Sequence, residues 1–207
     1  MSDSDKGEPS SDVVFSDAVK REQERRGSRG RFARMEARGG FRREIDADLA
    51  AFIARRDSFY FASASATGQP YVQHRGGPPG FLRVLDPQRL AFADLTGNEQ
   101  YVSLGNLAEN DRVQLFLMDY ANRRRVKVWG RARLVEDDDT LLAALRTDGD
   151  DKPARAIVVR VEAWDVNCPK HITQRFSEAE LAPAIGRLHQ RIAELEAEVA
   201  ALQADAD

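Results

Sequence analysis

Residues 112–135 read RVQLFLMDYANRRRVKVWGRARLV, two long runs in which apolar and polar residues alternate. In the second run, one set of alternate positions is apolar or small and the other set is mainly charged: Val126, Val128, Gly130, Ala132 and Leu134 against Lys127, Trp129, Arg131 and Arg133. A period of two predicts strands with one face toward a core and the other toward solvent or a partner. Ala121-Asn122 separates the runs at a turn, so we expect an antiparallel hairpin.

Shorter runs before and after this hairpin predict further strands. FYFASASA from Phe59 and YVQHR from Tyr71 flank the turn signal Thr67–Pro70, and FLRVL and RLAFA flank Asp86-Pro87, which suggests an antiparallel meander. A strand over 156–164 and helices starting near 46, 100 and 140 complete this region. Several strands with short turns favour a closed barrel, because closure removes exposed edges. We predict a mainly β, α+β fold, and the chain lacks the glycine-rich fingerprint of a Rossmann domain.

The chain before this region is polar and basic. Residues 1–12 predict disorder, 16–26 a short helix, and Gly27-Ser28-Arg29-Gly30 a loop. From Lys20 to Arg43 the chain holds ten Lys/Arg and three acids. The simplest interpretation is a solvated arm. A phosphate-binding arm is the functional alternative, and a nucleic-acid tail is less favoured because aromatic residues that stack on bases are nearly absent.

The C-terminal segment predicts an amphipathic helix. Ser177 and Glu180 match a capping box, and apolar residues then recur at steps of three and four: Ile185, Leu188, Ile192, Leu195, Val199 and Leu202. β-Branched residues at a and leucines at d favour a parallel two-stranded coiled coil, in which Arg191 and Glu196 pair between chains. The alternative is a helix packed on its own barrel. We therefore divide the chain into an arm (1–44), a barrel domain (45–176) and a helix (177–207).

Composition limits the class of protein. The 207 residues suit one domain with extensions, and the net charge of −3 gives no general attraction to nucleic acid. No apolar stretch approaches the roughly 20 residues of a membrane span, and the polar N-terminus does not resemble a signal peptide. Cys168 is the single cysteine, which fits a reducing cytoplasm. The three histidines lack metal-ligand spacing, so we expect no metal site.

Three polar segments stand out as candidate binding sites: 71–81, 92–107 and 164–172. Arg75 ends a strand before a glycine pair, and its planar guanidinium suits phosphate; a surface salt bridge is the alternative. A predicted helix start near Tyr101 and Ser103 is a natural anion site, although ordinary capping is common. Lys170 and His171 follow Cys168, whose thiol has no sign of a lowered pKa in the sequence.

Together with 19–29 (VK..Q...GSR) and 118–135, these segments resemble, in the same order, FMN-binding proteins of the pyridoxamine 5'-phosphate oxidase superfamily, in a subgroup distinct from the biosynthetic oxidase. The resemblance covers Phe15 to Phe176 and implies an FMN-binding split β-barrel that works as a homodimer, with FMN at the subunit interface. It implies that the ribityl phosphate is held by Gln73, His74, Arg75, Gly76, Asp94, Asn98, Tyr101 and Ser103. It further implies that the partner chain supplies Lys127, Trp129, Asn167, Lys170 and His171.

The sequence departs from the family pattern at the phosphate. The biosynthetic oxidase has an Arg-Lys pair where this chain has Val102 and Ser103, so we expect Arg75 first, and Arg29 second, to meet the phosphate charge. The subgroup more often carries Gln where Lys170 stands. The substrate residues of the oxidase are not recognisable, and we do not expect oxidation of pyridoxamine phosphate.

The resemblance implies an FMN-dependent oxidoreductase of unknown substrate, in which the flavin carries the chemistry and the catalytic residues are not identified. The alternatives are a non-catalytic FMN carrier and, less favoured, a nucleic-acid-associated protein that uses the arginine-rich arm.

Overall fold

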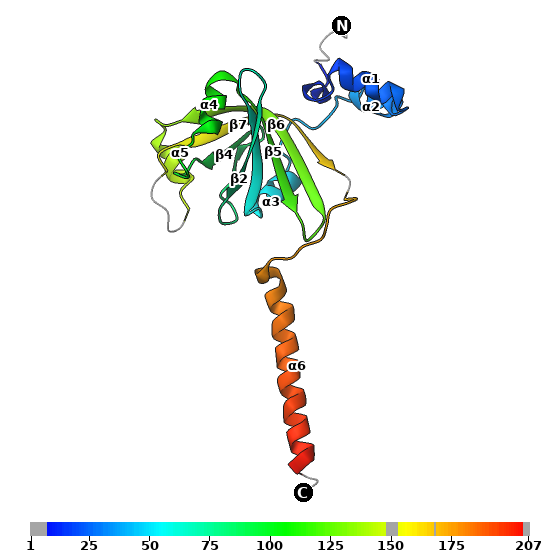
Figure 1. Ribbon diagram of the computed structural model, residues 1–207, viewed down its shortest axis with the longest axis vertical. Coiled ribbons are helices and arrows are strands. Elements are labelled where there is room, and N and C mark those ends of the chain that lie inside the picture. Colours follow the sequence, from blue (N-terminus) through cyan, green and yellow to red (C-terminus); the bar gives the residue numbers. More distant parts are fainter. Residues whose placement is uncertain (1–7, 148–152, 168, 205–207) are drawn as a thin grey trace. The chain divides into compact units, whose positions relative to one another are not determined.

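The computed structural model describes residues 8–147, 153–167 and 169–204, so Cys168 lies outside the described residues (Figure 1). The described residues form two compact units. The first runs to Asp119 and continues from Arg124 to Pro169; the second joins Tyr120–Arg123 to the residues from Lys170 onward.

The first unit is built on one seven-stranded antiparallel sheet in the order β2-β1-β5-β6-β7-β4-β3. Its strands are β1 Ser58–Ala64, β2 Pro70–Gly76, β3 Arg83–Asp86, β4 Arg89–Ala93, β5 Arg112–Asp119, β6 Arg124–Val135 and β7 Ala156–Asn167. The predicted hairpin over 112–135 is confirmed, because β5 and β6 pair from Asp119↔Arg124 to Arg112↔Arg131. The mainly β prediction is therefore correct.

The predicted meander is wrong at one connection. β1 pairs with β2 and β3 with β4, but β2 lies at one edge of the sheet and β4 pairs with β7 near the other edge. The intervening loop carries Pro78 and Pro79, whose missing N–H groups and fixed φ angles do not suit a tight hairpin.

The sheet curls around its core to give a split β-barrel. Phe59 and Phe61 of β1 meet Phe92 of β4 edge to face at 5.1 and 5.5 Å between ring centroids, although β5, β6 and β7 separate the two strands in the sheet. Helix α3, Ala47–Ala54, begins after its cap Asp46 as predicted and adds the fully buried Leu49, Phe52 and Ile53 to this core.

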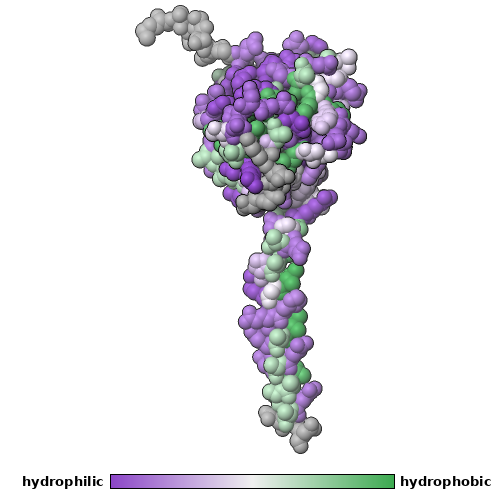
Figure 2. Space-filling view, turned by 90° about the vertical axis from the view of Figure 1, so that its left-hand side faces the viewer, coloured by the Kyte–Doolittle hydropathy of each residue, from purple (hydrophilic) through white to green (hydrophobic). Residues whose placement is uncertain are grey.

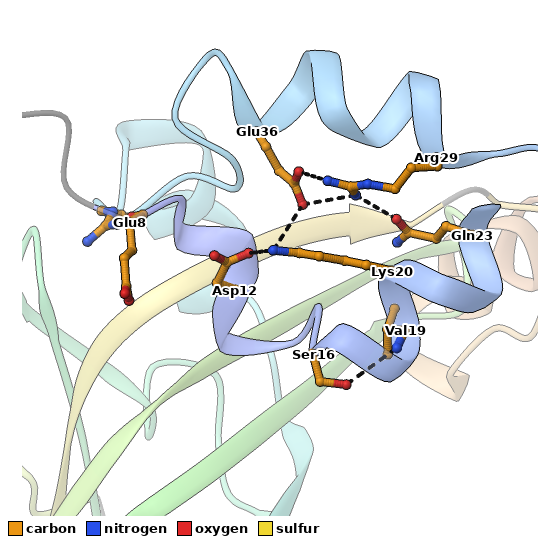
Figure 3. Close-up of polar contacts among 9 residues, drawn as sticks. Glu8, Asp12, Ser16, Val19, Lys20, Gln23, Arg29 and Glu36 are labelled. Atoms are coloured by element: carbon orange, nitrogen blue, oxygen red, sulfur yellow. Dashed lines mark hydrogen bonds and ion pairs between the residues drawn. The ribbon is translucent and has the colours of Figure 1, made fainter.

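The arm is folded in the part that the structure describes. It contains η1 (Ser10–Val13), α1 (Asp17–Arg25) and α2 (Arg29–Glu36). Figure 3 shows how ion pairs join these elements: Lys20 Nζ lies 2.8 Å from Asp12, and Arg29 pairs with Glu36 while donating to Gln23.

Two predictions for the arm are therefore wrong. Ser10 and Ser11 are buried rather than disordered, because the backbone N–H of Ser10 donates to Gly39 O (3.1 Å) and a tight backbone contact forms at Gly40. Helix α2 begins within the predicted loop, and its Phe32 packs edge to face on Phe15. Both features depend on contacts between distant residues. Residues 1–7 of the predicted disordered segment lie outside the described residues.

Residues 41–44 fasten the arm to the barrel. The Phe41 ring stacks on Trp129 of β6 with centroids 5.5 Å apart and planes at 15°. The backbone N–H of Trp164 on β7 donates to Arg42 O (2.8 Å), and its indole Nε1 donates to Glu44 O (2.7 Å). Residues 8–44 of the arm are thus part of the first compact unit rather than a free tail.

The remaining helices are α4 (Val102–Glu109), α5 (Asp139–Ala144) and α6 (Glu178–Ala204). The predicted capping box of α6 is confirmed: Ser177 N donates to Glu180 Oε2 (2.8 Å), and Glu180 N donates to Ser177 Oγ (3.3 Å). None of the helices in the described residues combines the length and apolar character needed to cross a membrane.

Candidate anion and ligand site

Strand β2 and the start of helix α4 meet at the site that two of the polar segments predict. Ser103 Oγ donates to Gln73 Oε1 at 3.1 Å, and Ser103 is buried. Both residues line a small cavity of about 70 Å³ together with Arg75, Asp94 and Tyr101. The structure therefore brings residues from separate segments of the sequence into one site.

A charged cluster forms one wall of this cavity. Arg75 Nη1 lies 2.9 Å from Asp94 Oδ1, and Arg155 Nε lies 3.1 Å from Asp94 Oδ2. Asp94 is only 4% exposed. Two guanidinium groups thus share one buried carboxylate, which leaves an excess positive charge in the cluster. Glu99 also lines the cavity, but it is exposed to water, which screens its charge.

One donor of the cluster is unused. Arg75 Nε is buried and has no hydrogen-bond partner among the described residues. A buried polar group without a partner is costly, and native structures usually satisfy such groups with a neighbour, a water or a ligand. Because Arg75 lines the cavity, an anion there would lie beside this side chain and the excess positive charge of the cluster.

The start of helix α4 adds further donors. Tyr101 is its N-cap residue, in the left-handed conformation (φ 51°, ψ 21°), and no described side chain caps the helix. The first N–H groups of a helix have no partner within it, and the helix dipole favours an anion there. Residues 101–104 line the cavity. Glu99 also has a positive φ of 57°, and such strained backbone is often retained at functional sites.

A second cavity of about 240 Å³ adjoins the first, because Gln73, Arg75, Leu95 and Gly97 line both. Its other walls include His74, Gly76 and the apolar side chains of Phe81, Phe92 and Leu145. A side chain at Gly77 would overlap the Phe81 ring, so the glycine is needed for this close packing. The arrangement is a small, positively charged cavity beside a larger and partly apolar one.

Lys127 and Trp129 lie elsewhere on the chain. Neither lines these two cavities; Trp129 lines a separate cavity of about 840 Å³ between the arm and the outer face of β1, β5, β6 and β7. Lys127 Nζ lies 5.0 Å from the Trp129 ring centroid and pairs in register with Asp165 on β7.

Burial perturbs both members of the Lys127–Asp165 pair. It lowers the pKa of Lys127, an effect that the charge of Asp165 partly offsets, and the nearby Arg125 lowers it further. Burial also raises the pKa of Asp165, against the attraction of Lys127. Burial therefore makes the charged form of each side chain less stable, and a charged or polar ligand beside the pair would change both pKa values.

Asn98 also lines the smaller cavity; it is exposed and accepts a hydrogen bond from Gln100 N (3.3 Å). The remaining predicted residues lie elsewhere on the chain. Asn167 ends β7, and its Oδ1 is buried and lacks a partner in the described chain. Lys170 and His171 are exposed residues of the second unit, and His171 has a φ of 65°. Their roles remain predictions.

Arg155 was not identified from the sequence, and Arg29 was named as a second candidate for the phosphate. Arg155 directly precedes β7, and the pairing of Ala93 with Ala156 places it beside Asp94. Only a correct β4–β7 pairing would have identified it. Arg29 is engaged with Glu36 and Gln23 in the arm and lines neither cavity. The described residues contain no group of three or more His, Cys, Asp or Glu that could hold a metal ion.

The fold and site define a small α+β split-barrel protein with a positively charged cavity between the edge strand β2 and the start of a helix. The family model for pyridoxamine 5'-phosphate oxidase matches residues 45–168. The chain belongs to this family.

The chain is also similar to several solved structures. A putative pyridoxamine 5'-phosphate oxidase from Lactobacillus delbrueckii is 23% identical, with a TM-score of 0.47 over 60% of this chain and 95% of that one. HupZ from Group A Streptococcus is 12% identical (TM-score 0.47; 64% and 100% covered). An FMN-binding protein from Syntrophomonas wolfei is 12% identical (TM-score 0.45; 73% and 95% covered). A search of curated proteins found no match.

Proposed function

We propose that this protein binds FMN and acts as a homodimeric, flavin-dependent oxidoreductase. The observation that carries the proposal is the cluster of Arg75, Asp94 and Arg155, with its unused Arg75 Nε, beside the uncapped start of α4. Family membership supports the same conclusion.

The residues present fit the two chemical parts of FMN. Its phosphate is a compact anion, which suits Arg75, Arg155, the Ser103 hydroxyl and the first N–H groups of α4. Its ring system is flat and partly apolar, and binding sites for such groups combine apolar walls with a few polar contacts. The adjoining cavity has apolar walls formed by Phe81, Phe92 and Leu95. Its polar groups come from Gln73, His74 and Gly76.

The second copy completes the site in this proposal. As the family resemblance implies, the partner chain contributes five residues beside the flavin ring: Lys127, Trp129, Asn167, Lys170 and His171. Asn167 offers an acceptor that lacks a partner in the described chain, and Lys127 offers a half-buried positive charge. The bound flavin supplies the redox chemistry; the protein residues bind and orient it and exclude water.

The first test is the visible absorption spectrum of the purified full chain, followed by mass identification of anything released on heating. We expect flavin bands and released FMN. A colourless protein that also fails to take up added FMN would contradict the proposal.

A second test separates an enzyme from a carrier. The FMN-loaded protein is mixed anaerobically with NADH or NADPH, and the flavin band is followed with time. Bleaching of this band supports an oxidoreductase. A flavin that stays oxidised with every nicotinamide and substrate tested indicates a non-catalytic FMN carrier. Light scattering on the same sample tests the homodimer, since a mass of one chain would exclude it.

A further inference from the structure

Helix α6 exposes a continuous apolar seam. Within the described residues the helix contains no buried side chain. Seven apolar residues, which we call the seam residues, are 40–70% exposed: Leu181, Ile185, Leu188, Ile192, Leu195, Val199 and Leu202. Figure 2 shows apolar surface following the helix along most of its length. Exposed apolar surface of this extent marks an interaction site.

The seam residues follow a strict heptad order. The a positions are Ile185, Ile192 and Val199, all β-branched, and the d positions are all leucine: Leu181, Leu188, Leu195 and Leu202. The structure places Leu181 inside the helix, which adds a fourth d position to the pattern visible from Ile185 onward. β-Branched a positions with leucine at d favour parallel two-stranded coiled coils over other assemblies.

The residues beside the seam are complementary in the same arrangement. In a parallel, in-register pair each g position faces the e position five residues later on the other chain. These facing pairs are Ala184 with His189, Arg191 with Glu196, and Glu198 with Gln203. One pair has opposite charges and none has like charges. The helix-weakening Pro183 and Gly186 fall at the f and b positions, away from the seam.

The width of the seam argues for a second copy rather than a barrel surface. A helix packed on a globular domain usually has a broad apolar face that includes e or g positions, whereas an a/d seam is the narrow signature of a coiled coil. The flanking g and e positions hold Arg191, Glu196 and Glu198. A second α6 presents the matching seam, places Glu196 opposite Arg191 and brings no like charges together.

We propose that α6 forms a parallel, in-register two-stranded coiled coil with α6 of a second copy of this chain. None of the seam residues lines the cavities around Arg75, and the proposal does not depend on the bound cofactor.

The test is site-specific disulfide formation in the full chain. Because Cys168 is the single cysteine, Cys168→Ser gives a cysteine-free background for Leu202→Cys at a d position. We expect a covalent dimer on non-reducing gels after mild oxidation. The matched control is Gln190→Cys, at the outward f position, which should remain monomeric on the gel.

The position of Leu202 near one end of the helix lets the test distinguish a parallel pair from an antiparallel pair. At 1.5 Å per residue, the two ends of the seam lie about 30 Å apart, so an antiparallel pair holds its two Leu202 positions far from each other. Absence of the Leu202→Cys dimer, or equal cross-linking at Gln190→Cys, would overturn the proposal.

A second variant separates this interface from the flavin site. Leu188→Lys with Leu195→Lys places charges in the seam, and we expect it to abolish cross-linking at Leu202→Cys while the FMN content per chain stays unchanged. Cross-linking that survives both charges would overturn the coiled coil whatever the flavin content is. A parent protein that is colourless, fails to take up added FMN and still cross-links would overturn the proposed function and leave the coiled coil supported.

Discussion

Arg75 and Arg155 bind opposite oxygens of one buried carboxylate, that of Asp94, at 2.9 and 3.1 Å. Arg75 belongs to β2 at one edge of the sheet, whereas Asp94 follows β4 and Arg155 precedes β7 near the other edge. The cluster therefore links the two sides of the split barrel and also places positive charge at the start of α4. One group of residues thus contributes to the closure of the fold and, in the proposed function, to the binding of the FMN phosphate.

Replacing Arg75 with Ala should weaken FMN binding roughly ten- to a hundredfold, because a hydrogen bond to a charged group is worth about 1.5–3 kcal/mol and about 1.4 kcal/mol corresponds to tenfold. Arg155→Ala should act in the same direction. Fluorescence titration of FMN into the flavin-free variants measures the dissociation constant.

The matched control is Arg89→Ala, which removes an exposed arginine that pairs with Asp86 outside both cavities. Its affinity for FMN should equal that of the parent. An unchanged affinity in both Arg75→Ala and Arg155→Ala would show that the phosphate binds elsewhere.

The sequence predicted the parts of this site that depend on local patterns. Period-two alternation located β2 and the β5–β6 hairpin, and a polar loop before a helix located the start of α4. Arg75, Asp94 and Ser103, which the family resemblance groups at the phosphate, line one cavity in the structure, and their role in binding stays a prediction.

The sequence did not predict the parts that depend on distant pairing. Arg155 is an isolated arginine before a strand, and only the β4–β7 register brings it to Asp94. The fold of the arm likewise depends on the stacking of Phe41 on Trp129 and on the contact of Ser10 with Gly39. Neither contact has a signal in the local sequence, because each joins segments whose proximity is set by the whole sheet.

Asp94→Asn should destabilise the fold. The substitution keeps the shape of the side chain but leaves Arg75 and Arg155 facing each other without a counter-charge. Removing one member of a buried ion pair costs about 3–5 kcal/mol; the amide oxygen still accepts a hydrogen bond, so we expect about 3 kcal/mol. Urea unfolding of the flavin-free protein measures the loss.

Asp86→Asn is the control for this experiment, because it disrupts an exposed pair with Arg89 and should cost less than about 1 kcal/mol. Equal losses in the two variants would mean that the Asp94 cluster contributes no more than a surface ion pair.

Asp165→Asn should lower the pKa of Lys127 further, because the charge of Asp165 raises that pKa against the larger effect of burial. The opposite control is Arg125→Gln, which removes a like charge and should raise the pKa of Lys127. NMR titration of the lysine ε-carbon follows both changes. A pKa that moves in the same direction in both variants would contradict the assigned causes.

The same pair gives a pH dependence with a defined sign. The folded chain holds the Lys127 proton less tightly than the unfolded chain, whose lysine keeps its ordinary pKa of 10.5. Between the lowered pKa and 10.5 the unfolded state binds more protons, so the contribution of Lys127 to the free energy of unfolding rises with pH across this window. In Asp165→Asn the rise should begin at lower pH, which denaturant unfolding at a series of alkaline pH values measures.

Gly130→Ala should destabilise the barrel, whereas Gly105→Ala should not. Gly130 lies where the β6–β7 register shifts, and a Cβ there would overlap the carbonyl oxygen of Arg160 on β7. The paired strands have to move apart, and overpacking of this kind costs about 1–3 kcal/mol.

A Cβ at Gly105 would meet nothing within 4 Å, and alanine is favoured over glycine inside a helix by about 1 kcal/mol. Urea midpoints should therefore fall for Gly130→Ala and rise for Gly105→Ala; a Gly130→Ala midpoint equal to that of the parent would show that the strands accommodate the methyl group without cost.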